Sequence, residues 1–301
     1  MYEEAARNVR RTALVVLWVL ALASGLGFLI GSLLGSGRIG LITGLALAGA
    51  ASFATYHSGH RLILRSARAR RVEPDEQPRL HNLVDGLAGA AGVPKPAVYV
   101  VPEAAPNAFA AGTRPERCVI AVTEGLLEKL DRVELEGVLA HEVAHIRDRD
   151  ALLGTVVASL VGSAAVPAEF LLRSLGLEGS PAGPTGSSRP GAGGILMLIP
   201  AAVLAPLALV AAQTTRLAVS PGREYLADVQ GALLSRYPPG LTRALRKVAA
   251  DETPMRAARN STAHMWLSRP PRERRERATW FDDLFATHPP MEDRIRRLEE
   301  M

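Results

Sequence analysis

The sequence has a single cysteine, Cys118, among its 301 residues. One cysteine excludes an internal disulfide and any metal site built from cysteine thiolates. Cys118 stands in a short apolar stretch, residues 118–122, which is typical of a strand, so we expect its side chain to be buried. A metal site in this chain must therefore use histidine and carboxylate ligands.

Aromatic residues are also scarce, at 5%, whereas hydrophobic residues together make up 48% and the mean hydropathy is +0.11. The apolar content is therefore mainly small and aliphatic, and it is gathered into runs. Residues 12–34 and 39–56 are two such runs, each close to the roughly 20 residues that cross a bilayer core. They predict a transmembrane hairpin. The alternative for the first run is a cleavable signal peptide, although the second run follows it at once.

Arginines mark the two outer ends of this hairpin, while the turn between the runs has only Arg38. The outer arginines are Arg7, Arg10, Arg11, Arg61, Arg65, Arg68, Arg70 and Arg71. By the positive-inside rule, both ends face the cytoplasm. Two further apolar runs, 151–172 and 195–218, flank a Gly-, Pro- and Ser-rich loop at 173–194, so we expect a second pair of spans. The first of these runs can continue the preceding helix directly.

The chain between and after these spans has the pattern of a folded soluble part. Spacing predicts a helix over residues 80–91, and short apolar stretches bounded by turn residues predict strands over 97–101, 107–112 and 118–122. Near the C-terminus, 241–250 and 294–298 have helical patterns. A small sheet is therefore expected to precede the central motif.

That motif is His141-Glu142-Val143-Ala144-His145. On a helix, two histidines four residues apart project from one face, so both imidazoles can bind one cation. Glu142 lies on a neighbouring part of that surface, where a carboxylate can take a proton from water. The motif predicts two zinc ligands and a base.

Catalytic zinc usually has three protein ligands, so one more donor is needed. The best candidate is Glu224, at the start of a helix-compatible segment. Asp228, one turn later on the same face, can hydrogen-bond a ligating histidine. The alternative is a chance pattern in a helix that binds no metal. The apolar helical face around Val138 and Leu139 and the separate acidic segment argue against it.

These residues resemble the HtpX-type membrane-integral zinc endopeptidases, the heat-shock proteases related to the CAAX prenyl proteases. Four segments carry the likeness, in the family's order over most of the chain: 107–112, 141–145, 223–228 and 287–298. The resemblance implies one Zn²⁺ per chain bound by His141, His145 and Glu224, with Glu142 as general base and Asp228 in support. It also implies polypeptide substrates, namely misfolded or damaged membrane proteins.

The expected fold class is an α-helical integral membrane protein of about four spans with a mixed α+β zincin-like metalloprotease domain. The first hairpin takes residues 1–60, and the second pair takes 151–218 with its outward loop at 173–194. The catalytic part is divided between 61–150 and 219–301. Both catalytic segments face the cytoplasm, and the protein is expected in the cell membrane as a multi-pass protein.

Two more residues are candidates for substrate binding. Asn107 opens a short strand that, in zinc peptidases of this type, can hold a substrate backbone as an added strand; the alternative is an ordinary turn residue. The family motif around His288 lies beside the active site, so His288 can steady an oxyanion or the peptide, or simply pack. The remaining histidines outside these motifs are expected at the surface or an interface: His57, His60, His81 and His264.

The net charge of +5 is compatible with anionic lipid or with nucleic acid. Lipid is favoured because the basic residues flank the apolar runs and the sequence has no recognisable nucleic-acid-binding module. Two other functions stay open. One is a narrow-specificity prenyl-protein-type protease, and the other is a non-catalytic membrane scaffold with a structural zinc.

Overall fold

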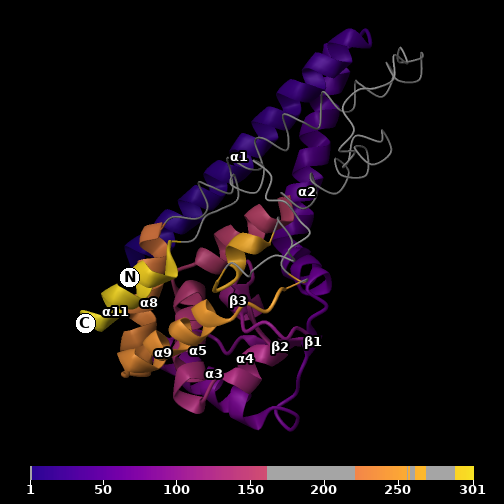
Figure 1. Ribbon diagram of the computed structural model, residues 1–301. Helices are drawn as coiled ribbons and strands as arrows, with labels where there is room; N and C mark the ends of the chain where they lie inside the picture. Colours follow the sequence, from indigo (N-terminus) through magenta and orange to yellow (C-terminus); the bar gives the residue numbers. More distant parts are fainter. Residues whose placement is uncertain (1, 161–220, 256, 258–261, 269–288) are drawn as a thin grey trace, which may run out of the picture.

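The computed structural model describes residues 2–160, 221–255, 257, 262–268 and 289–301. Two long helices, α1 (Tyr2–Leu33) and α2 (Gly37–Ser66), run side by side and project from the other elements (Figure 1). Both are long and apolar enough to cross a membrane, and few residues in their apolar windows are buried. The predicted N-terminal pair of apolar helices is therefore confirmed. Of the expected third and fourth spans, 151–172 and 195–218, the structure describes only residues 151–160.

A four-stranded sheet with strand order β1-β2-β4-β3 lies at the centre of the remaining part. Its strands are β1 (Arg70–Arg71), β2 (Ala97–Val101), β3 (Ala108–Ala111) and β4 (Val119–Thr123). β2 and β4 are parallel, and the two outer pairs are antiparallel. All three predicted strands are present, with β2 at its expected limits. β3 lies at an edge of the sheet.

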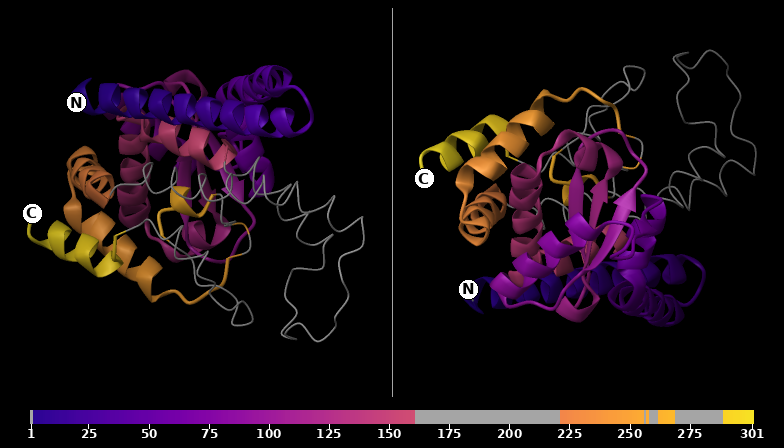
Figure 2. Two further views of the ribbon diagram at one scale, coloured as in Figure 1. Left: turned by 90° about the horizontal axis from the view of Figure 1, so that it is seen from above. Right: turned by 90° about the horizontal axis from the view of Figure 1, so that it is seen from below.

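Both faces of the sheet are covered, because successive side chains point to opposite sides. One face packs on the helices α3 (Pro78–Ala91) and α5 (Arg132–Arg147) (Figure 2). The other face, which includes Phe109, packs on the end of α2 and on Trp266. β4 is therefore buried at every residue, Cys118 just before it is buried as well, and this accounts for the unbroken apolar run.

Local interactions determine where helix α5 begins and ends. Asp131 accepts hydrogen bonds from the backbone N–H groups of Val133 and Glu134, and the Glu134 carboxylate accepts one from the N–H of Asp131. Such a reciprocal cap stabilises a helix by about 1 kcal/mol. At the other end, Arg149 adopts a left-handed φ of 62°. The idea that α5 continues into the next apolar run is therefore wrong: a separate helix, Asp150–Leu160, begins after the turn.

Three further helices complete this part: α8 (Pro221–Ser235), α9 (Pro238–Ala250) and α11 (Met291–Glu299) (Figure 1). α11 packs on α9 and α8, and α8 and α9 pack directly on α5. Two glycines allow this close packing. A Cβ added at Gly231 would lie 2.8 Å from the backbone N of His141, and one added at Gly137 would lie 2.6 Å from the backbone N of Leu241. α8 can therefore bring its first turn directly to the histidine helix. The short elements are η1 (Pro115–Arg117), α4 (Glu124–Lys129) and η2 (Ala263–Met265).

Candidate active site

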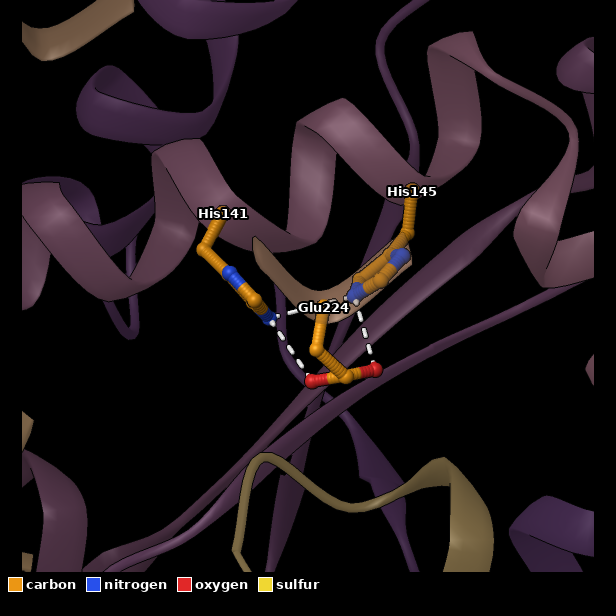
Figure 3. A group of neighbouring side chains, drawn as sticks. All are labelled: His141, His145 and Glu224. Atoms are coloured by element: carbon orange, nitrogen blue, oxygen red, sulfur yellow. Dashed lines mark hydrogen bonds and ion pairs between the residues drawn. The ribbon is translucent and has the colours of Figure 1, made fainter. Parts of the chain in front are cut away.

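His141 and His145 project from α5 towards Glu224, which lies in the first turn of α8 (Figure 3). The two Nε2 atoms are 3.1 Å apart. Glu224 Oε2 lies 3.9 Å from His141 Nε2, and Glu224 Oε1 lies 3.7 Å from His145 Nε2. One ligand atom from each residue lies within 4.8 Å of the other two. The structure thus brings together all three residues that the sequence singled out as metal ligands.

Each histidine contacts a carboxylate through its other ring nitrogen. Asp228 Oδ1 lies 3.0 Å from His141 Nδ1, and Asp150 Oδ2 lies 3.2 Å from His145 Nδ1. With the proton on Nδ1, each Nε2 presents its lone pair to the space beside Glu224. Two oriented imidazoles and one carboxylate form a donor set that fits zinc.

Asp228 was predicted for this role, but Asp150 was missed. Asp150 stands five residues after His145, a spacing that does not share a helical face. The left-handed turn at Arg149 is what brings its carboxylate back to His145. The motif His145-Ile-Arg-Asp-Arg-Asp150 has two acidic residues near the histidine, but the sequence does not show which of their carboxylates contacts the imidazole.

Arg294 was also missed. It lies on α11, is fully buried, and forms two hydrogen bonds with Asp228: Nε donates to Oδ2 at 2.8 Å and Nη2 donates to Oδ1 at 2.7 Å. Arg294 Nη1 also lies 3.5 Å from Glu224 Oε2. Burial alone would raise the pKa of Asp228, but Arg294 outweighs it and the pKa falls to about 2. Arg294 therefore keeps Asp228 ionised beside His141.

Glu142 is buried on α5 and lines a cavity of about 50 Å³. Burial raises the pKa of its carboxyl to about 7, although the nearby His145 opposes the shift. A carboxyl group with a pKa near neutral can both accept and return a proton. The cavity is shared with His145, Glu224, Ala110, His264 and Met265.

The charges around His145 favour its protonation. Burial by itself lowers the pKa of His145, but the Asp150, Glu224 and Glu142 carboxylates together raise it to about 9. The pKa of His141 is instead lowered, chiefly by burial. In the metal-free protein, the surrounding carboxylates thus favour the protonated, positively charged form of His145.

Asn107 lies just before β3, and its buried side chain binds another part of the same chain. Its Nδ2 donates to Ser268 O at 2.8 Å, and Ser268 N donates to its Oδ1 at 3.2 Å. Leu267 N donates to Ala108 O at 2.9 Å. Residues 267–268 therefore occupy part of the edge of β3 that was expected to receive substrate, while Ala110 lines the cavity.

Two of the four histidines outside the motifs differ from expectation, whereas His57 is exposed as predicted. His264 is buried and lines the cavity, with Nε2 3.3 Å from Gly154 O, and His81 is buried with Nε2 3.0 Å from Val72 O. The prediction that these two lie at the surface or an interface is wrong, because tertiary contacts that no spacing pattern records enclose them. His288 lies outside the described residues.

A family model described as Peptidase family M48 matches residues 74–301. The chain belongs to peptidase family M48. It is therefore a metallopeptidase with an HExxH motif, His141–Glu142–His145, and the candidate ligand cluster His141, His145 and Glu224. The match includes the strands β2, β3 and β4 and the helices α5, α8 and α11, and it begins after α1, α2 and β1. This M48 part has the mixed α+β, zincin-like fold that was predicted.

M48 relatives named "Protease HtpX homolog" align over nearly the whole chain. The relative from Pyrococcus furiosus is 42% identical over 293 residues, which cover 97% of this chain and 95% of the relative. The relative from Tropheryma whipplei is 40% identical over 302 residues, covering 100% and 98%. The relative from Desulforapulum autotrophicum is 40% identical over 283 residues, covering 93% and 87%. The predicted HtpX-type resemblance is confirmed.

Proposed function

We propose that this M48 peptidase is a membrane-integral zinc-dependent endopeptidase that holds one Zn²⁺ per chain. The main support is the meeting of His141, His145 and Glu224, with ligand atoms within 4.8 Å of one another, beside the buried Glu142. These three residues would hold the metal, and Asp228 would orient His141. Zinc, when bound, polarises the scissile carbonyl and makes a water molecule more acidic.

Glu142 acts as the general base in this proposal. Its carboxylate accepts a proton from the attacking water and then returns it to the leaving amine. The proposal is supported by its position in the cavity next to His145 and by its pKa of about 7. A scaffold with a structural zinc has no use for a buried carboxylate at this position, which favours the enzyme over that alternative.

The substrate backbone pairs with the edge of β3 at Ala110. Ala108 O points away from β4, since it accepts a hydrogen bond from Leu267. Alternate residues of a strand direct their backbone groups to the same side, so those of Ala110 also point away from β4, towards the cavity. Asn107 contributes indirectly by holding Ser268 on the same edge. His288 stays a candidate for steadying the oxyanion or the peptide.

The substrates we propose are misfolded or damaged membrane proteins, which the enzyme cleaves on the cytoplasmic side. α1 and α2 would place the site beside the bilayer, and the arginines at their outer ends support this orientation. A second pair of spans in residues 151–218 would complete four. The structure describes this region only as far as Leu160, in a helix that packs against α1.

The test compares the wild type with Glu142→Gln as full-length proteins in detergent, stripped by a chelator and reloaded with zinc. We expect about one zinc per chain in both, and cleavage of unfolded casein reduced about a thousandfold in the variant. Glu136→Gln is the matched control, because it removes the same charge from the same helix outside the cavity lining. It should keep both properties.

Two outcomes contradict the proposal. Stoichiometric zinc with no cleavage by the wild type supports a structural metal. Equal cleavage by the wild type and Glu142→Gln removes Glu142 from the role of base.

A further inference from the structure

Asn8, near the start of α1, is almost completely buried, with 1% of its surface exposed. Its side-chain nitrogen donates two hydrogen bonds, to Asp148 O at 2.8 Å and to Asp150 Oδ1 at 2.7 Å. Both atoms that face this nitrogen are acceptors, so they determine the orientation of the amide. An apolar helix at the N-terminus thus binds the turn that follows the histidine helix.

The second oxygen of Asp150 leads to the metal site. Asp150 Oδ2 lies 3.2 Å from His145 Nδ1, while Arg223 Nη1 lies 3.2 Å from Oδ1. Asn8 and Arg223 therefore hold one carboxylate oxygen and leave the other to His145. A continuous path of contacts runs from Asn8 through Asp150 to a candidate zinc ligand.

Asn8 is held in place by the packing of α1. Val15 on α1 packs against Leu152, Val156 and their neighbours in the helix Asp150–Leu160. In Figure 2 (left), α1 lies along this helix. Asn8 also contacts the turn that contains Arg149, whose left-handed backbone is uncommon for a residue other than glycine. Its bond to Asp148 O ties this turn to α1.

We propose that Asn8 is a positioning residue of the zinc site, acting through Asp150 on His145. The inference rests on the proposed zinc-dependent function. Without the amide, Asp150 loses its shortest contact and can turn towards Arg223, which leaves the His145 ring less firmly oriented. α1 is then part of the active centre, although the M48 match begins only at residue 74.

The first test measures zinc affinity by competition with a chromophoric chelator, using full-length protein in detergent. Outer partners of metal-binding histidines contribute roughly 10- to 100-fold to affinity; because Asn8 acts one contact further out, we expect Asn8→Ala to raise the zinc Kd about tenfold. Thr12→Val is the matched control. Thr12 is buried one turn further along α1, and its hydroxyl donates only to Asn8 O within that helix. Its Kd should stay at the wild-type value.

The second test separates positioning from general stabilisation of α1. In an Asp150→Ala background the path to His145 is already broken, so adding Asn8→Ala should leave the zinc Kd unchanged. A merely structural role would instead raise the Kd by the same factor in both backgrounds. That result, or a wild-type Kd for Asn8→Ala alone, overturns the inference. A wild type that binds no zinc overturns the proposed function itself.

Discussion

Gly231 is where the contact between α5 and α8 is most sensitive to an added atom. A methyl group there would lie 2.8 Å from the N and 2.9 Å from the Cα of His141. Ordinary contacts begin near 3.4 Å, so in Gly231→Ala the two helices must separate by about 0.5 Å. Glu224 lies seven residues earlier on the same face of α8, so it moves away from the histidines with the helix.

We expect Gly231→Ala to lower both the stability of the protein and its affinity for zinc. Overpacking of this kind destabilises a protein by about 1–3 kcal/mol. Metal–ligand distances tolerate only about 0.2 Å, so the zinc Kd should rise roughly 10- to 100-fold, which corresponds to about 1.4–2.7 kcal/mol. The zinc Kd is measured by chelator competition, and stability is measured as the thermal midpoint of the metal-free protein.

Two alanine variants serve as controls. Gly137→Ala adds a methyl group 2.6 Å from the N of Leu241, so it strains the contact of α5 with α9, which contributes no ligand. It should lower the midpoint to a similar extent and change the Kd much less. In Gly86→Ala, in α3, the added methyl group meets no atom of the described residues within 4 Å, so this variant should stabilise the helix by about 1 kcal/mol and leave zinc binding unchanged.

An unchanged Kd in a destabilised Gly231→Ala would refute the reasoning, because α8 would then adjust without moving Glu224. An equal loss of affinity in Gly137→Ala would refute it as well, since the effect would then follow stability and not ligand geometry.

Three further predictions concern Arg294, His145 and Cys118. Arg294→Met leaves the Asp228 carboxylate buried without its partner, so it should lower the free energy of unfolding, measured by denaturant titration, by about 3–5 kcal/mol. Arg294→Lys should restore little of this stability because lysine lacks the paired donors of the guanidinium group. Wild-type stability in Arg294→Met would contradict this prediction. The pKa of His145 is raised to about 9, so one proton must leave the imidazole when zinc binds, and the zinc affinity should fall as the pH falls below 9. Calorimetry in two buffers at pH 7.5 should detect the release of about one proton on zinc binding. No proton release would mean that His145 is neutral in the metal-free protein. Burial raises the pKa of the Cys118 thiol to about 12, so a thiol reagent at pH 8 should label it only after unfolding, and rapid labelling of the native protein would show that the sheet opens.

The local features of the site could be predicted from the sequence. The spacing of His141 and His145 places them on one helical face, and alternation and turn residues indicated the strands and the helices around them. Glu224 and Asp228 could be nominated because they share a helical face and have the required chemistry. Such inferences succeed because side-chain direction repeats regularly along a helix or strand, so residues one or two turns apart can be placed on the same face from the sequence alone.

The partners of these residues depended on packing between distant segments. Asp150 reaches His145 only because Arg149 turns the chain, and Arg294 meets Asp228 across 66 positions. Asn8 lies 142 positions from Asp150. The side chain of Asn107 hydrogen-bonds to Ser268, so it does not lie at a free edge of β3. No local period records such contacts, since each is decided by which helix faces pack together. The sequence by itself determined which residues could bind metal and accept a proton. The tertiary structure decided which charges and hydrogen bonds hold them in position.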